Sequence, residues 1–304
     1  MKVSRNNRIY IILRKTWRRI KRKTDELEYT LRLFKVRNTA ILYQNNRKQI
    51  ENQVNLHWFS LERSDHKENV GDYLSTVVCD YMLLQRGISL KKIVNRKKNL
   101  YAIGSIIDGG AQNATVWGSG LIHGEKYISR FEHLFRKLDV RCVRGPETMK
   151  VLRKKGYKCP NVYGDPAILM PFIYKPRILE EKQEYVVVLH HQSNIKYSKE
   201  NKIDIVTSDY KQFIDKLVNS KLVISSSLHG IILAEAYGIP AILLEDSSTD
   251  DKFKYDDYYQ STGRSNYPIA SSIEDGIKMT PLRLPNLKPL QENLIKSFPY
   301  DLWE

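Results

Sequence analysis

The feature of this sequence that most constrains its fold is a set of short, almost wholly apolar runs in its second half. They are YVVVLHH (185–191), IDIVTSD (203–209), LVISS (222–226) and PAILLE (240–245), and helical patterns cover 210–219 and 229–237. Strands that are apolar throughout, rather than alternating, are typical of parallel sheets covered by helices on both faces. The pattern therefore predicts a βαβαβ unit.

The first half has a similar alternation of short β-prone runs and helical runs. A polar stretch, KPRILEEKQE (175–184), separates the halves and resembles a linker. We expect an α/β protein with two Rossmann-like domains that face a cleft. The predicted strands are 56–62, 99–105, 114–120 and 139–145, and the predicted helices are 73–87, 125–138 and one that begins at Pro146. A chain of 304 residues suits two such domains.

The positive charge of the chain lies mostly at its N-terminus. Residues 1–48 hold fifteen Lys or Arg and three acids, which leaves +4 of the total net charge of +16 for the other 256 residues. Residues 14–37 combine these cations with apolar side chains at helical spacing. Such a basic amphipathic helix can lie on an anionic membrane, pack on a neighbouring domain or bind nucleic acid. The low net charge of the other 256 residues argues against a nucleic-acid-binding protein.

Other features narrow the class of protein. No apolar run approaches the roughly 20 residues of a membrane span, and the first, IYIIL (9–13), is too short for a signal peptide. The three cysteines, Cys79, Cys142 and Cys159, are widely spaced, which argues against a disulfide framework or a zinc site. We expect a cytoplasmic protein without a bound metal or cofactor.

The turn SSSLHG (225–230) places polar residues between two strongly apolar runs. It follows a predicted strand and begins a predicted helix, which is where ligands bind in open α/β sheets. The free N–H groups there favour an anion, the hydroxyls of Ser225, Ser226 and Ser227 add donors, and Gly230 lets a ligand approach closely. The alternative is that the serines only cap the helix and His229 is structural.

Two further candidates lie in the first half. ENVGDYLS (68–75) places Asn69 and Asp72 at the start of a helix, either as an ordinary cap or beside a ligand. Arg144 ends a predicted strand, where its guanidinium suits a phosphate or carboxylate, although a surface ion pair is equally consistent with its position. The acids at 250–257 alternate with lysines, which argues against a metal site.

Together these motifs resemble the polysaccharide pyruvyl transferase family. Their order is N-x-G-D (69–72), V-R (143–144), G-D-P-A (164–167), S-S-x-L-H-G-x-I-x-A-E-A-Y-G-I-P (225–240) and K-F-x-Y-x-D-Y-Y-x-S-T-G (252–263). The resemblance runs from about residue 56 to 265. It implies a fold like that of two-domain GT-B glycosyltransferases and transfer of pyruvate from phosphoenolpyruvate to sugar hydroxyls, with the formation of a ketal. On this basis we expect segments 1–50 (basic helical extension), 51–175 (acceptor-side domain), 176–280 (donor-side domain) and 281–304 (C-terminal helical segment).

The resemblance also implies roles for particular residues. Arg144, Leu228 and His229 would line the phosphoenolpyruvate site, and Asp72 would lie on the opposite wall. Many members of the family have an arginine at the position of Ser227, whereas others read S-L-H-G as here. The second cation is then open, and Lys252 and Arg264 are the candidates.

The chemistry of ketal formation fits these residue types. Protonation of the methylene carbon of phosphoenolpyruvate gives a cationic centre that a sugar hydroxyl attacks; phosphate then leaves and a second hydroxyl closes the ring. We expect His229 as acid or base, Arg144 as the anion clamp and Asp72 as a second proton-handling or acceptor-orienting group. His190 and His191 end a strand and either face the cleft or have no role. The acceptor would be a lipid-linked glycan, brought near by residues 1–45 at the inner face of the cell membrane.

Two alternatives remain. A GT-B-type glycosyltransferase would bind a nucleotide sugar in the same cleft through a glutamate, for which Glu235 is the candidate, although its apolar surroundings favour a structural role. A glycan-binding relative without activity is the other, and Ser227 is the one residue that suggests it. A preference for nucleotide sugars would indicate the glycosyltransferase, and a preference for phosphoenolpyruvate would indicate the pyruvyl transferase.

Overall fold

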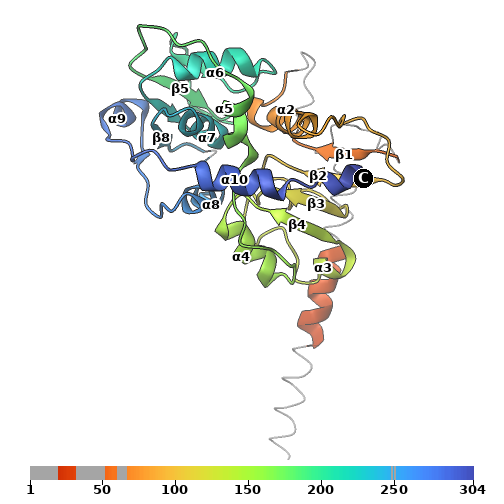
Figure 1. Ribbon diagram of the computed structural model, residues 1–304. Helices are drawn as coiled ribbons and strands as arrows, with labels where there is room; N and C mark the ends of the chain where they lie inside the picture. Colours follow the sequence, from red (N-terminus) through yellow and green to blue (C-terminus); the bar gives the residue numbers. More distant parts are fainter. Residues whose placement is uncertain (1–19, 32–51, 60–66, 248, 250) are drawn as a thin grey trace, which may run out of the picture.

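The computed structural model describes residues 20–31, 52–59, 67–247, 249 and 251–304. Two parallel sheets dominate it, one in each half of the chain (Figure 1). The first contains, in spatial order, β1 (Val54–His57), β2 (Lys98–Tyr101), β3 (Ala114–Trp117) and β4 (Leu138–Cys142). Its helices are α2 (Val70–Leu84), α3 (Glu132–Phe135) and α4 (Pro146–Lys154).

The second sheet has five parallel strands in the order β6-β5-β7-β8-β9. The strands are β5 (Val186–Leu189), β6 (Lys202–Asp204), β7 (Val223–Ser225), β8 (Ala241–Leu244) and β9 (Ile269–Ala270). Helices α6 (Tyr210–Val218), α7 (Leu228–Ala236) and α9 (Ile273–Lys278) pack against them. The prediction of an α/β protein with two Rossmann-like parallel sheets is confirmed.

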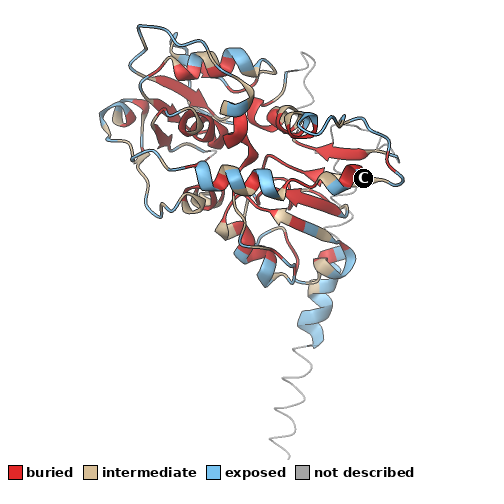
Figure 2. Cartoon of the chain, viewed as in Figure 1, coloured by how far each residue is buried: buried red, intermediate tan, exposed pale blue. Residues whose placement is uncertain are grey.

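The apolar runs of the sequence are the central strands of this second sheet. Every residue of β5, β7 and β8 is buried, as Figure 2 shows. Helix α7 is also buried along its length, which explains why LHGIILAEA lacks a polar face. It contacts η2 (Pro166–Leu169) and α2 as well as its own sheet, and so lies between the two halves.

The prediction of a helix over 125–138 is wrong for most of its length. Only α3 is helical there, and the backbone is extended at Arg136. The buried guanidinium of Arg136 donates to the carbonyls of Ile107 and Gln112 at 2.7 and 2.9 Å and to the carboxylate of Glu132 at 2.9 Å. These bonds hold the chain against the loop between β2 and β3, so the helix ends.

Two other segments also differ from the sequence expectation. NVYGD (161–165) forms only an isolated bridge between Tyr163 and Val143 rather than a strand. The aromatic segment at 250–264, which carried no helix prediction, contains helix α8 (Phe253–Ser261). Its buried side chains include Tyr255, Tyr258 and Tyr259. Here burial of aromatics outweighs a sequence that is rich in charges.

The C-terminal segment returns to the first sheet. Helix α10 (Lys288–Ser297) lies across the molecule in Figure 1, and η3 (Tyr300–Trp303) follows it. Trp117 Nε1 donates to the carbonyl of Leu294 at 2.9 Å, and the Tyr300 hydroxyl donates to that of Met82 at 2.9 Å. The polar segment 175–184 joins α5 (Met170–Ile173) to β5, and the domain boundaries expected from the sequence stay a prediction.

Of the basic N-terminal segment, the described part is a helix over residues 20–31, most of which is exposed (Figure 2). It contacts the loop before α3: Tyr29 donates to the carbonyl of Lys126 at 2.8 Å, and Glu26 accepts from the backbone N–H of Arg130 at 3.1 Å. The helix prediction is thus confirmed for this part. Residues 14–19 and 32–37 of the predicted helix lie outside the described residues.

Candidate active site

A cavity of about 190 Å³ lies at the carboxyl ends of strands from both sheets. Its walls combine the N-terminal ends of helices α2 and α7 with the loops after β1, β2 and β5. The residues that line it are Phe59, Asn69, Asp72, Ser105, Ile106, Ile122, His190, His191, Gln192, Ser227, Leu228, His229 and Lys254. Five of the eleven site residues expected from the sequence are therefore brought together here: Asn69, Asp72, Ser227, Leu228 and His229.

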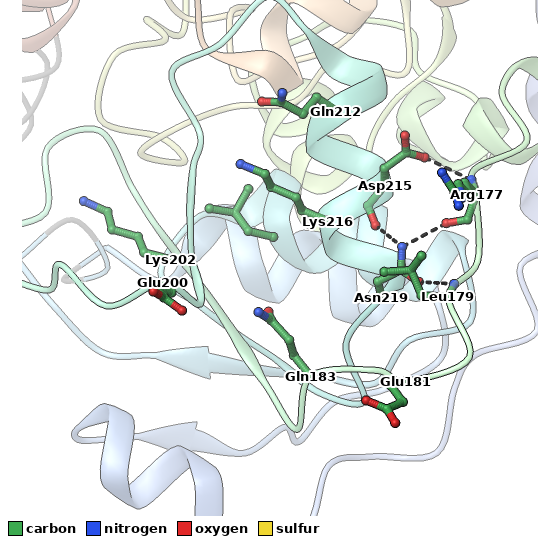
Figure 3. A pocket seen from close by; sticks show the side chains of 11 residues that line it. Arg177, Leu179, Glu181, Gln183, Glu200, Lys202, Gln212, Asp215, Lys216 and Asn219 are labelled. Carbon is green, nitrogen blue, oxygen red and sulfur yellow. Dashed lines mark hydrogen bonds between the residues drawn. The ribbon is translucent and has the colours of Figure 1, made fainter.

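A larger hollow of about 350 Å³ lies elsewhere, between the segment 177–183 and helix α6 (Figure 3). Asn219 fastens that segment to the helix, because its side chain accepts from the N–H of Leu179 at 2.7 Å and donates to the carbonyl of Arg177 at 2.8 Å. Most of its lining side chains are exposed and carry both signs of charge. The 190 Å³ cavity, with its buried titratable groups, is the better candidate for a site of chemistry.

Two helix N-termini meet at the cavity. Asn69 caps α2, where its side chain accepts from the N–H of Gly71 at 3.0 Å. Ser227 occupies the N-cap position of α7, yet its hydroxyl makes no capping hydrogen bond. A Cβ on Gly71 would lie 2.0 Å from Cγ of His229, so only glycine lets the two helix ends approach this closely. Their N–H groups and dipoles favour an anion between them.

The three serines of the turn have different tasks. Ser225 Oγ donates to the carbonyls of Val188 and Ser227 at 2.8 and 2.9 Å and accepts from the N–H of Ser227 at 3.0 Å. Ser226 Oγ accepts from the N–H of His190 at 2.9 Å. These two hydroxyls hold the turn together, which leaves the Ser227 hydroxyl at the cavity wall.

Gly230 serves packing rather than ligand approach. It lies outside the cavity lining, and a Cβ there would come within 2.4 Å of Ser225 Oγ and 3.0 Å of Val188 Cγ1. The glycine therefore lets α7 lie directly on strands β5 and β7. The sequence predicted the need for close approach but assigned the wrong neighbour.

Arg144 lies behind the cavity wall. Its side chain is 1% exposed, and Nε donates to Asp257 at 3.1 Å, Nη1 to Ser105 Oγ at 2.6 Å and Nη2 to the Leu121 carbonyl at 2.7 Å. In this arrangement the guanidinium contacts the cavity only through Ser105, which is a lining residue. Its charge nevertheless acts on the site, because it adds to the effect of burial in lowering the pKa of His229.

The cation that lines the cavity is Lys254, which sequence reasoning missed. It lies in the first turn of α8 with a relative exposure of 9%, and burial together with the charge of Arg144 lowers its pKa to about 8. The two expected cations are paired elsewhere: Lys252 lies 3.2 Å from Glu245, and Arg264 makes two bonds of 2.6 and 2.7 Å to Glu235. The sequence did contain a signal for Lys254, because this residue lies inside the K-F-x-Y motif (252–255), at the position that the motif leaves unspecified.

Glu235 has a structural environment. Besides the two bonds from Arg264, it accepts from the buried hydroxyl of Tyr258 at 2.7 Å. It lies outside the cavity lining. The glutamate that a nucleotide-sugar site would need is thus engaged between α7 and α8.

The histidines of the site are neutral near pH 7. Burial, followed by the charges of Arg144 and Lys254, lowers the pKa of His229 to about 3. Burial and Lys254 likewise lower the pKa of His190 to about 3 and that of His191 below its ordinary value. Both strand-end histidines face the cavity. A neutral imidazole has one nitrogen that can accept a proton.

Asp72 has the opposite character. Burial, and next the neighbouring charge of Asp165, raises its pKa to about 8, although Lys254 partly opposes this. The carboxyl group is therefore mostly protonated at pH 7. A protonated acid and a neutral imidazole in one cavity form a pair of titratable groups whose environments separate their pKa values, which is how acid and base roles are assigned at neutral pH.

Comparison with protein families matches residues 10–248 to the family described as "Polysaccharide pyruvyl transferase". The match includes most of the basic N-terminal segment and ends before Lys252 and Lys254. Among curated proteins, an uncharacterized protein of Acanthamoeba polyphaga mimivirus is 27% identical over 210 residues, which cover 64% of this chain and 71% of the relative.

A second curated relative is the "Succinoglycan biosynthesis protein ExoV" of Rhizobium meliloti, which is 29% identical over 154 residues. That alignment covers 47% of this chain and 48% of ExoV. Among solved structures, a functionally uncharacterized protein of Klebsiella pneumoniae matches with a TM-score of 0.45 and 15% identity, over 63% of this chain and 84% of that one. Because the family match spans well over half of the sequence, the chain belongs to the polysaccharide pyruvyl transferase family.

Proposed function

We propose that this protein transfers pyruvate from phosphoenolpyruvate to two hydroxyls of a sugar and so forms a ketal on a bacterial polysaccharide or its lipid-linked precursor. Family membership supports the class of reaction, and the relative ExoV supports a place in exopolysaccharide biosynthesis. The observation that carries the proposal is the cavity itself, in which Lys254, neutral His229 and protonated Asp72 meet at two helix N-termini.

Phosphoenolpyruvate is a small polyanion, and the cavity offers the groups that bind one. The Lys254 ammonium, the Ser227 hydroxyl and the N–H groups that begin α7 would hold its phosphate and carboxylate. Arg144 adds positive charge from behind the wall through Ser105. We therefore assign Lys254 the role of direct anion partner and retain Arg144 as an electrostatic support.

Proton transfer follows from the two protonation states. Asp72 gives its proton to the methylene carbon of phosphoenolpyruvate, which becomes a methyl group and leaves a cation at the adjacent carbon. A sugar hydroxyl bonds to that carbon as its proton passes to His229. The phosphate then leaves with the proton from His229, a second hydroxyl bonds to the same carbon, and its proton returns to Asp72. Both residues thus end in their starting states.

The competing functions have less support. A nucleotide-sugar transferase would need a glutamate in the cavity, but no glutamate is among the described residues that line it, and Glu235 is bound to Arg264 and Tyr258. A binding protein without activity has no need for an acid and a base with opposed pKa shifts.

Thermal denaturation tests the proposal with phosphoenolpyruvate and UDP-glucose as the two probes. A ligand at 100 times its dissociation constant stabilises the fold by about 2.7 kcal/mol. For a protein near this size, that corresponds to a rise in Tm of roughly 5–10 °C. We expect that rise with phosphoenolpyruvate and none with UDP-glucose. The reverse result would replace the proposal with a glycosyltransferase.

We also propose that the basic N-terminal segment carries the protein to an anionic membrane surface, where a lipid-linked acceptor would be found. Within the described residues no helix is long and apolar enough to cross a membrane. The helix over residues 20–31 instead has exposed cations beside exposed apolar side chains, Ile20 at 57% and Leu31 at 53%. A surface of this composition suits the headgroup region of an anionic membrane.

A further inference from the structure

The G-D-P-A motif (164–167) contains a buried carboxylate, that of Asp165, which has no role in the proposed function. Asp165 is 1% exposed and begins η2, where its Oδ1 accepts from the N–H of Ala167 at 3.0 Å. Its Oδ2 lies 3.8 Å from Nε2 of His229. Both of these atoms are buried, and neither has a hydrogen-bond partner in the described part of the chain.

The two nitrogens of His229 therefore have different surroundings. Nε2 is turned toward Asp165, whereas Nδ1 lies on the side of the ring that faces Gly71, at the start of α2. Because Nε2 is fully buried, Nδ1 is the nitrogen that remains for a molecule in the cavity that His229 lines. The choice of tautomer thus decides whether the cavity meets a proton acceptor or a donor.

An ionised carboxylate next to Nε2 selects one tautomer. It can only accept a hydrogen bond, so it favours a proton on Nε2 and a lone pair on Nδ1. Burial raises the pKa of Asp165 to about 6, with the Ala167 N–H and the charge of Arg144 opposing the rise, which leaves it mostly ionised at pH 7. The other charged groups that act on this pair are Lys254 and Asp72, which line the cavity, and Asp257, which is the ion-pair partner of Arg144.

We propose that Asp165 is a positioning residue that holds His229 as the Nε2–H tautomer, so that Nδ1 takes the proton of the attacking sugar hydroxyl. The proposal rests on the function proposed above. As the oxygen of the hydroxyl bonds to the pyruvyl carbon, its proton moves to Nδ1 and the ring becomes an imidazolium. The proton on Nε2 stays in place, and the negative charge of Asp165 balances the ring until Nδ1 gives its proton to the leaving phosphate.

Asp165→Asn tests this assignment. The amide oxygen can still accept from the Ala167 N–H, so the turn is retained, but the amide nitrogen then faces Nε2 with a donor. The variant should therefore invert the tautomer to Nδ1–H. Asp209→Asn is the matched control, because Asp209 also caps a helix through its side chain, at 2.9 Å from the N–H of Gln212, and is exposed.

The measurement is nitrogen NMR of the full chain with ¹⁵N-labelled histidine at pH 7, with the His229 signals assigned from their loss in His229→Gln. We expect the proton on Nε2 in the wild type and in Asp209→Asn, and on Nδ1 in Asp165→Asn. A wild-type proton on Nδ1, or an unchanged tautomer in Asp165→Asn, would overturn the proposal. If that variant does not fold, the wild-type spectrum alone decides.

This readout needs no substrate, so it separates the two proposals. An Nε2–H tautomer without a thermal shift from phosphoenolpyruvate would count against the proposed function and leave the Asp165–His229 pairing intact. A thermal shift with an Nδ1–H tautomer would do the opposite.

Discussion

Lys252 and Lys254 are two residues apart, and the fold gives them opposite surroundings. The side chain of Lys252 is 40% exposed and paired with Glu245, whereas Lys254 is buried at the cavity. The reason is the helical geometry of α8, whose buried positions include Lys254 and Tyr255. Residue types alone do not distinguish the two lysines. Which one lines the cavity is decided by the packing of α8 against the turn after β7, where Tyr255 donates to the Ser226 carbonyl at 2.7 Å.

The raised pKa of Asp72 leads to a prediction of how the stability of the fold depends on pH. Its pKa is about 8 in the folded protein against an ordinary value of 3.8, so between these values the native state holds a proton that the unfolded state has lost. Stability must then fall as the pH rises, by about 1 kcal/mol per pH unit for one buried carboxyl group. From pH 7 to 8 the buried histidines, whose folded pKa values are lowered, add little to this slope, because they are neutral in both states. Lys254 opposes it in part: its folded pKa is lowered to about 8, so the folded protein loses a proton there that the unfolded chain keeps.

Urea unfolding at pH 7 and pH 8 measures this effect. The wild type should lose roughly 0.5–1 kcal/mol over the interval, and Asp72→Asn should lose much less. Asp80→Asn, which removes an exposed acid from the same helix α2, should behave like the wild type. Equal slopes for all three proteins would mean that Asp72 is ionised at pH 7 and is not the acid of the proposed reaction.

Among the helices and strands, those with continuous apolar runs could be predicted from the sequence, whereas those set by contacts with distant residues could not. The central strands of the second sheet and helices α6 and α7 lie within one or two residues of their predicted ranges, because their burial is written in continuous apolar runs. Helix α3 is short because buried Arg136 bonds to a distant loop, and no local pattern reports such a partner. The same holds for Arg144, whose partner Asp257 lies on α8.

The helix over residues 20–31 leads to a prediction for membrane binding. Lys21, Arg22 and Lys23 are exposed on it, and each cation near an anionic surface contributes about 1 kcal/mol. Replacing all three with alanine should therefore weaken binding to vesicles of phosphatidylcholine with phosphatidylglycerol by roughly 100-fold. Co-sedimentation with and without phosphatidylglycerol measures this.

A matched control exists elsewhere on the surface. Lys91, Lys92 and Arg96 are also exposed, so their replacement by alanine removes the same charge from another face. Binding that falls equally in both triple variants would point to net charge rather than to the helix. Binding that neither variant changes would remove the membrane proposal.

At the scale of the whole molecule, the site exists only because the two halves meet. Asp72 comes from the first half and His229 and Lys254 from the second, and the N–H of Val70 donates to the carbonyl of Ile205 at 2.8 Å across the junction. The sequence predicted that strand ends carry the site, since that follows from parallel topology. It did not predict that Arg144, Ser225 and Gly230 support the wall from behind, because that depends on how the halves pack.

The most direct test of the proposed phosphoenolpyruvate site is calorimetric titration of phosphoenolpyruvate into the wild type, Lys254→Met and Lys252→Met. Loss of a buried cation that faces the anion costs about 2 kcal/mol or more, which corresponds to a drop in affinity of about 30-fold. We expect that drop for Lys254→Met and wild-type affinity for Lys252→Met. No binding by the wild type, or equal affinity in all three proteins, would contradict it.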